Sequence, residues 1–162
     1  MTDLYEYYAA DPSLDAHTGV SELYGYRIVH VDGSCLDNGS TNARAGMGLY
    51  YGRDSPLNAA VQYLLANPMN NGSEVMAAAA VMAVVWSETA ECRMPMYKTL
   101  CIATDSTYVM HEAAKVASSR RFNAEAWAFY DTALQQLRNI GIDMILLKVK
   151  GHDTSLENNE AD

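Results

Sequence analysis

The sequence predicts an α/β fold in which three strands of an antiparallel meander come first and two further strands alternate with helices. Apolar and polar residues alternate through Ile28–Asp32, as in a half-buried strand. The Ala- and Met-rich run Val75–Ser87 indicates a well-buried helix. A length of 162 residues suits one domain with a single sizeable core.

The first half of the chain contains the extension and the meander. Residues 1–24 are rich in Tyr and Asp and are interpreted as a peripheral extension or a flexible leader, with a docking segment for a partner as the alternative. We expect the first strand to end at Asp32 in a tight turn. Asn38-Gly39 is a further turn signal, because both residues tolerate positive φ. Gly46 and Gly48 indicate a close backbone approach or a bulge. The predicted strands are Tyr26–Asp32, Ala45–Gly52 and Asn58–Leu65.

The second half contains the helices. Residues 66–72 are predicted as a loop, after which Ser73 is the expected N-cap of the buried helix and Glu74 lies in its first turn. In the last helix Trp127 has helical spacing with Tyr130 and Leu134, so we interpret it as a core residue. The remaining elements are a strand at Thr99–Thr104, a helix at Ser106–Ala117, a helix at Asn123–Ile140 and a strand at Ile142–Lys150.

The composition describes an ordinary globular protein, with 49% hydrophobic and 19% charged residues. No apolar run is long enough for a transmembrane helix, and no signal peptide or other targeting signal is seen. Three cysteines without framework spacing fit a reducing compartment. We therefore expect an intracellular protein, cytoplasmic or nuclear, that does not contact membranes and is a monomer.

The net charge of −9 opposes nucleic-acid binding at first sight. Residues 1–24, however, hold five acids and no Lys or Arg, and the rest of the chain has 15 acids against 11 Lys and Arg. That balance is compatible with a modest nucleic-acid contact and does not argue for one.

Three acids stand at the ends of predicted elements. Asp32 follows the first strand, Glu74 opens the first long helix and Asp105 follows the fourth strand; Asp162 joins them from the C-terminus. Carboxylates brought together repel unless cations hold them, and their oxygens suit Mg²⁺ or Mn²⁺. Taken singly, a strand-end Asp is more often a turn former or a cap, and Glu74 is more simply a favourable charge at a helix N-terminus.

A set of motifs in chain order resembles ribonuclease H of type 1. The resemblance covers residues 26–162, and its most specific part is a His followed ten residues later by an Asp. It implies a ribonuclease H-like fold, with a central mixed five-stranded sheet of three antiparallel and two parallel strands flanked by helices. The motifs are Asp32-Gly33-Ser34-Cys35, Asn38-Gly39, Ala43-Arg44-Ala45-Gly46, Glu74, Thr104-Asp105-Ser106, Lys150-Gly151-His152 and Asn159-Glu160-Ala161-Asp162.

The resemblance implies a metal-dependent endoribonuclease that cleaves the RNA strand of RNA–DNA hybrids. Asp32, Glu74, Asp105 and Asp162 would hold two Mg²⁺ ions, with Mn²⁺ as a substitute, and His152 would assist proton transfer or product release. RNA is distinguished from DNA by its 2′-hydroxyls. The residues implied in substrate binding are Gly33, Ser34, Cys35, Asn38, Asn70 and Asn71.

The sequence departs from the family in three places. Met69 lacks the hydroxyl that helps hold a DNA phosphate, and only Lys115, Arg120 and Arg121 could form a basic protrusion. We expect residues 1–24 to be an N-terminal extension and residues 25–162 a ribonuclease H domain without the usual C-terminal helix. Two alternatives follow: a catalytically weakened or inactive module that binds nucleic acid or a partner, and a nuclease of the same fold with another substrate.

Overall fold

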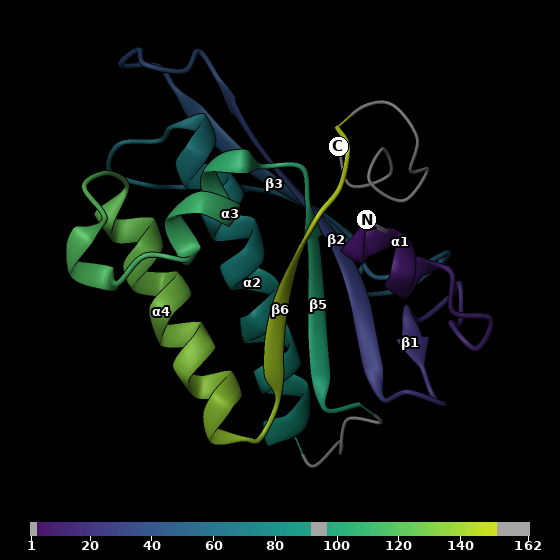
Figure 1. Cartoon of the computed structure of the whole chain (residues 1–162). Helices are drawn as coiled ribbons and strands as arrows, with labels where there is room; N and C mark the ends of the chain where they lie inside the picture. Colours follow the sequence, from purple (N-terminus) through teal and green to yellow (C-terminus); the bar gives the residue numbers. More distant parts are fainter. Residues whose placement is uncertain (1–2, 92–96, 152–162) are drawn as a thin grey trace.

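A mixed β-sheet forms the centre of the computed structural model, which describes residues 3–91 and 97–151. The strands are β1 (Val20–Ser21), β2 (Tyr26–Leu36), β3 (Arg44–Tyr50), β4 (Ala59–Tyr63), β5 (Thr99–Thr104) and β6 (Asp143–Lys148). They lie in the order β4-β3-β2-β5-β6, with β1 paired to β2 outside that order (Figure 1). β3 runs antiparallel to both β2 and β4, whereas β5 runs parallel to both β2 and β6. The predicted mixed sheet is therefore confirmed.

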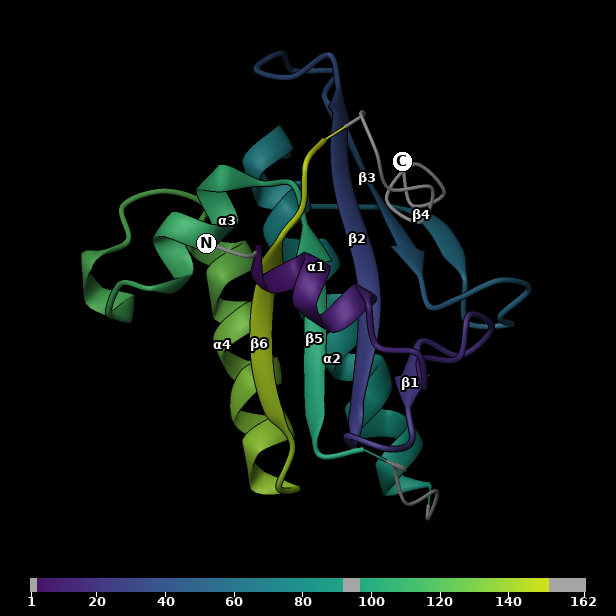
Figure 2. The same ribbon diagram turned by 45° about the vertical axis from the view of Figure 1, so that its right-hand side comes forward.

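Helices cover the two faces of the sheet unequally. They are α1 (Leu4–Ala9), α2 (Asn70–Ala90), α3 (Thr107–Ala113), the 3₁₀ helix η1 (Ala117–Ser119) and α4 (Ala124–Asn139). α2 and α4 pack side by side on one face, and α1 lies across the other (Figures 1 and 2). In the described part of the chain, no helix is both long and apolar enough to span a membrane.

The main core lies between the sheet and the two long helices. Val29 and Ile102 from the sheet, Val81 from α2 and Leu137 from α4 are fully buried there. Burying each such side chain stabilises the fold by about 1.5–3 kcal/mol. Trp127, with 3% of its surface exposed, belongs to this core, as predicted.

Strand β2 is longer than predicted. It continues through Asp32 and Gly33 to Leu36, so the expected tight turn after Asp32 is wrong. The continuation follows from the ladder with β3, which still pairs Asp32 with Gly48 and Leu36 with Arg44. The chain reverses at residues 37–40 instead. There the positive φ angles belong to Asp37 (53°) and Gly39 (82°), and Asn38 is not among the positive-φ residues.

Helix α2 begins earlier than predicted. Its N-cap is Met69, in extended backbone without a side-chain hydrogen bond, so neither the loop over residues 70–72 nor the cap at Ser73 is correct. Ser73 and Glu74 are buried inside the helix, and the Ser73 hydroxyl donates back to the Met69 carbonyl at 3.1 Å. Helix α3 is shorter than predicted, since it ends at Ala113 and residues 117–119 form η1.

Residues 3–24 contact the sheet along much of their length. Helix α1 is capped by Asp3, and β1 pairs antiparallel with β2. The Tyr5 hydroxyl and His30 Nε2 lie 2.9 Å apart and join α1 to β2. His30 is nearly fully buried, and this burial lowers its pKa to about 4. On this outer face α1 packs on a second, smaller apolar cluster made by β2, β5, β6 and the residue after β6.

Candidate active site

Three carboxylates from three elements meet at one edge of the sheet. The parallel ladder between the neighbouring strands β2 and β5 ends at His30 and Ala103, so Asp32 and Asp105 each stand two residues beyond it along the chain. Glu74 comes from the second turn of α2, which packs against β2. One oxygen from each carboxylate lies within 4.8 Å of the others. The structure thus brings together three of the four carboxylates named from the sequence, Asp32, Glu74 and Asp105.

A glycine allows α2 to approach β2 at this point. A Cβ on Gly33 would overlap the backbone nitrogen of Glu74 and the carbonyl carbon of Ser73. The Gly33 N–H points between the carboxylates and donates to Asp32 Oδ1 at 3.0 Å and to Glu74 Oε2 at 3.1 Å. The close approach predicted for Gly46 is not found there, because a Cβ on that residue would meet its neighbours at ordinary distances of 3.5 Å or more.

The electrostatics of the cluster depend on burial. Glu74 is 6% exposed, whereas Asp32 and Asp105 are half-buried. Burial, and then the negative charges of Asp32 and Asp105, raise the pKa of Glu74 far above its ordinary value. Lys148 Nζ donates to the backbone carbonyl of Asp105 and adds a positive charge at this edge.

The donor set fits a hard divalent cation. Three carboxylates offer oxygen ligands, which Mg²⁺ and Mn²⁺ prefer. A cation bound among them would compensate the repulsion that raises the pKa of Glu74. The cluster opens into a cleft of about 510 Å³, so a bound cation would remain accessible to a substrate.

The predicted substrate-binding residues divide into two groups. Gly33, Ser34, Asn70 and Asn71 line the cleft beside the carboxylates. Cys35 and Asn38 do not line it. Asn38 has a structural contact instead: its Oδ1 accepts from the backbone N–H of Asn70 at 3.2 Å and joins the β2–β3 turn to the start of α2. His152 and Asp162 lie outside the described residues.

Sequence reasoning missed several residues around the cluster. Ser106, Thr107 and Tyr108 line the cleft. A second groove of about 290 Å³ shares Asp32, Gly33 and Ser34 with the cleft and runs along β2, β3 and β4. Its lining includes Arg44 and Gln62. Arg44 stood within a motif of the resemblance, but nothing in its spacing assigned it a role.

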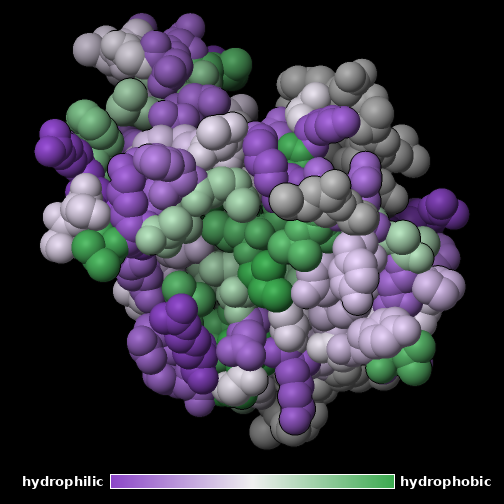
Figure 3. All heavy atoms as spheres, in the orientation of Figure 1, coloured by the Kyte–Doolittle hydropathy of each residue, from purple (hydrophilic) through white to green (hydrophobic). Residues whose placement is uncertain are grey.

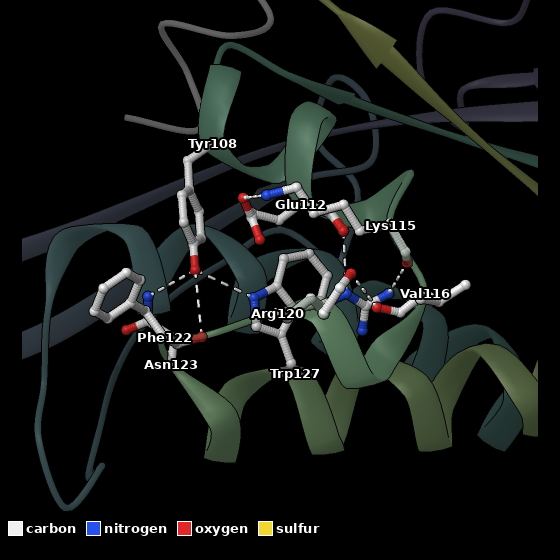
Figure 4. A network of polar contacts seen from close by, with 9 residues as sticks. Tyr108, Glu112, Lys115, Val116, Arg120, Phe122, Asn123 and Trp127 are labelled. Carbon is white, nitrogen blue, oxygen red and sulfur yellow. Dashed lines mark hydrogen bonds and ion pairs between the residues drawn. The ribbon is translucent and has the colours of Figure 1, made fainter.

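Tyr108 is held at the cleft by polar contacts with α4 (Figure 4). Its hydroxyl accepts hydrogen bonds from Asn123 Nδ2 at 2.9 Å and Trp127 Nε1 at 3.3 Å, and it donates to the carbonyl of Phe122 at 3.4 Å. These bonds join Tyr108 on α3 to Trp127 on α4 and to Phe122 and Asn123, the last residues of the loop between the two helices. The position of Tyr108 therefore depends on that loop.

The same loop contains the three residues considered for a basic protrusion. Arg120 turns inward, where its guanidinium lies 4.2 Å from the centre of the Trp127 ring and donates to both oxygens of Asp131 at 2.8 Å. Lys115 pairs with Glu112 at 2.6 Å. Arg120 and Lys115 thus each pair with an acid of the same region.

Comparison with known proteins gives one consistent family. The family model described as RNase H matches residues 25–162. Ribonuclease H1 of Mus musculus is 27% identical over 148 residues, which cover 83% of this chain and 47% of the mouse protein. The chain spans about half the length of the curated relatives it matches, between 47% and 55%.

Solved structures of low identity share the fold. RNase H1 from the halophilic archaeon Halobacterium salinarum superposes with a TM-score of 0.52 at 18% identity, over 85% of this chain and 92% of the archaeal one. LC11-RNase H1, solved in complex with an RNA/DNA hybrid, gives a TM-score of 0.55 at 14% identity, over 83% of this chain and 89% of the other.

Proposed function

Since this chain belongs to the ribonuclease H family, we propose that it hydrolyses the RNA strand of RNA–DNA hybrids with divalent metal ions held at its carboxylate cluster. The observation that carries this proposal is the meeting of Asp32, Glu74 and Asp105 within 4.8 Å in an open cleft. Three carboxylates so close are costly for folding, because they repel one another or one of them must hold a proton, and a metal site gives a reason for that arrangement.

The proposed metal ligands are Asp32, Glu74 and Asp105, with Asp162 completing the set and His152 assisting proton transfer or product release. Two Mg²⁺ ions, or Mn²⁺ in their place, would activate a water and stabilise the leaving oxygen in phosphodiester hydrolysis. The Gly33 N–H fixes the carboxylates of Asp32 and Glu74 by donating to both.

The proposed substrate path follows the cleft and the adjoining groove. Asn70 and Asn71 line the cleft, and their amides can both donate to and accept from a ribose 2′-hydroxyl. Arg44, in the groove along β2 and β3, would contact a backbone phosphate. The crystallised complex of LC11-RNase H1 with an RNA/DNA hybrid supports a hybrid as the ligand for this fold.

Substitution of one proposed ligand tests the activity. The wild-type protein should cut the labelled RNA strand of a hybrid in Mg²⁺ or Mn²⁺ and leave it intact in EDTA. Asp105→Asn should lower the cleavage rate at least about a thousandfold, equivalent to about 4 kcal/mol of transition-state stabilisation, without lowering the melting temperature. Asp143→Asn, at an exposed Asp at the start of β6, is the control and should cut at the wild-type rate.

The same assay separates the nuclease from a binding-only module. A folded wild-type protein that binds hybrid without metal and cuts with neither ion would favour the binding module. An active Asp105→Asn protein would contradict the assignment of the cluster.

A further inference from the structure

The N-terminal segment forms a groove at the end of the sheet opposite the carboxylates. The groove has a volume of about 740 Å³, and its floor includes Tyr26 and Thr99, the first residues of β2 and β5. Asp32 and Asp105 stand beyond the other ends of the paired parts of these strands. Six residues of β5 span about 20 Å, so a molecule in the groove would leave the carboxylate cleft open. In Figure 2 this face of the sheet lies in front, with α1 crossing it.

Tyrosines form the wall of the groove and hold one another in place. The rings of Tyr7 and Tyr8 meet edge to face at 5.6 Å, and those of Tyr8 and Tyr26 at 4.8 Å. The Tyr26 hydroxyl donates to the Tyr8 carbonyl at 2.7 Å. Tyr7 and Tyr24 nevertheless remain 69% and 68% exposed. A wall ordered before binding loses little conformational entropy on binding, and exposed tyrosines are typical of protein interfaces.

The charge on this wall is negative. Glu6 and Asp11 line the groove. Burial acts to raise the pKa of Asp11, but hydrogen bonds from Ser21, Ser13 and Tyr26 outweigh it and lower this pKa to about 2. Asp11 is therefore ionised at neutral pH.

Among the residues that the structure describes, few cations lie near these two acids in the chain. Residues 3–24 contain no Lys or Arg. Arg27, next to Tyr26 in the chain, is buried and lies 3.5 Å from Glu88. Lys98, next to Thr99, is exposed. The groove thus combines exposed aromatic rings with an excess of negative charge.

This combination selects the kind of molecule that fits. Phosphate backbones and anionic lipids would be repelled by Glu6 and Asp11. Guanidinium groups stack on tyrosine rings and pair with carboxylates. Leu4 and Leu23, 53% and 69% exposed, extend the apolar surface of the segment beyond the groove, which is more than a small cation would cover. Figure 3, in the orientation of Figure 1, shows weakly polar side chains in the region of α1, beside a more apolar area at the centre of the view.

We propose that this groove is a docking site for a basic, arginine-containing segment of a partner protein, which holds the chain on that partner while the carboxylate cleft faces its substrate. The proposal goes beyond the nuclease activity and does not depend on it.

A defined peptide tests the groove. The probe is a fluorescein-labelled (Gly-Arg)5 peptide, with (Gly-Glu)5 as its charge-reversed counterpart, titrated into the ¹⁵N-labelled protein in about 0.1 M NaCl. We expect shifts of backbone amides confined to residues 6–11, 24–26 and 99. The double variant Tyr7→Ala/Tyr24→Ala should weaken binding about 4- to 25-fold, because each aromatic contact to a cation contributes a factor of about two to five. Glu6→Gln should weaken it at least about threefold.

Matched variants separate the groove from general attraction to an acidic protein. Phe129→Ala removes a ring of similar exposure on α4, and Glu22→Gln removes an acid from the same segment outside the groove lining. Both should bind (Gly-Arg)5 within about twofold of wild type. Circular dichroism of each variant verifies its fold.

Four results would overturn the proposal. They are no binding at about 1 mM peptide, equal binding of (Gly-Glu)5, binding unaffected by the double tyrosine variant, and amide shifts centred on the carboxylate cluster. The double variant should still cut an RNA–DNA hybrid at the wild-type rate. Peptide binding therefore tests the docking proposal and hybrid cleavage tests the nuclease proposal, and either can fail without the other.

Discussion

Replacing Glu74 with Gln should stabilise the metal-free protein. Glu74 is 6% exposed and faces two other carboxylates, and burial together with these charges raises its pKa from 4.5 to about 9. Gln removes the charge while keeping an oxygen that accepts the hydrogen bond from the Gly33 N–H, which is 3.1 Å long in the wild type. The substitution therefore isolates the electrostatic cost of the site.

The magnitude follows from proton linkage. At pH 7 the folded protein must hold a proton on Glu74 that the unfolded chain releases near pH 4.5. At about 1.36 kcal/mol per pH unit, this difference costs about 3 kcal/mol. Because the folded pKa is raised, the cost is absent below pH 4.5, grows as the pH rises and becomes constant above about pH 9. For a domain of this size, 3 kcal/mol corresponds to about 6–12 °C in melting temperature.

Thermal unfolding in EDTA from pH 4 to pH 9, followed by circular dichroism, measures this effect. The advantage of Glu74→Gln over the wild type should be near zero at pH 4 and increase steadily with pH. It should shrink when both proteins are measured in Mg²⁺, because the proposed metal site would stabilise the wild-type carboxylate. Glu22→Gln, at an exposed position, should change stability by less than about 0.5 kcal/mol at any pH. A Glu74→Gln protein that is less stable than wild type in EDTA at pH 8, or whose advantage does not vary with pH, would refute this reasoning.

Three further substitutions test other parts of the structure by thermal unfolding. Gly33→Ala places a Cβ against the backbone of α2 and should cost about 2 kcal/mol or more, whereas Gly46→Ala should cost less than about 1 kcal/mol because its Cβ meets ordinary contacts; equal effects would contradict the close approach. Burial lowers the pKa of His30 from 6.5 to about 4, so the stability of the wild type relative to His30→Gln should fall by about 3 kcal/mol as the pH drops through that window; comparing the two proteins at each pH cancels the opposite change that Glu74 contributes to both. Arg120→Lys cannot reproduce the paired bonds and ring stacking of the buried guanidinium and should cost about 1–3 kcal/mol, while Arg121→Lys, at an exposed position, should be neutral.

Much of the sheet could be predicted because its signals are local. Alternation in β2 and the short apolar run of β5 depend only on neighbouring residues, and the bounds Thr99–Thr104 agree with the prediction. The meeting of Asp32, Glu74 and Asp105 needed more than alternation. That prediction depended on motifs that occur in the order of the family, because no spacing rule says that residues 31 or more positions apart converge in space.

The start of α2 could not be predicted because tertiary packing overrides propensity there. Asn70, Asn71 and Gly72 are poor helix formers, and Met69 provides no capping side chain. These residues become helical because the first turn lies beside β2, where Gly33 leaves room for it. The bond from Asn70 N–H to Asn38 Oδ1 satisfies one of the free donors of this helix end.

The placement of α1 is equally beyond local reasoning. A six-residue helix is too short to be stable by itself in water, and its sequence shows no long amphipathic pattern. Its position depends on contacts far along the chain, such as the one between the Tyr5 hydroxyl and His30. The sequence marks the segment as rich in Tyr and Asp, and only the fold shows that these residues form the wall of one groove.

The error at Asp32 explains how the cleft opens. The sequence suggested that β2 ends at this carboxylate, yet β2 continues to Leu36 and it is β5 that stops, at Thr104. Among the described residues, β2 beyond His30 therefore pairs with β3 alone, and its other edge faces α2 and Asp105. An open α/β sheet places ligands where neighbouring strands part in this way. The backbone of Asp32 is thus fixed in the ladder with β3, while its side chain lines the cleft. A backbone held in this way gives the rigid support that a metal ligand requires.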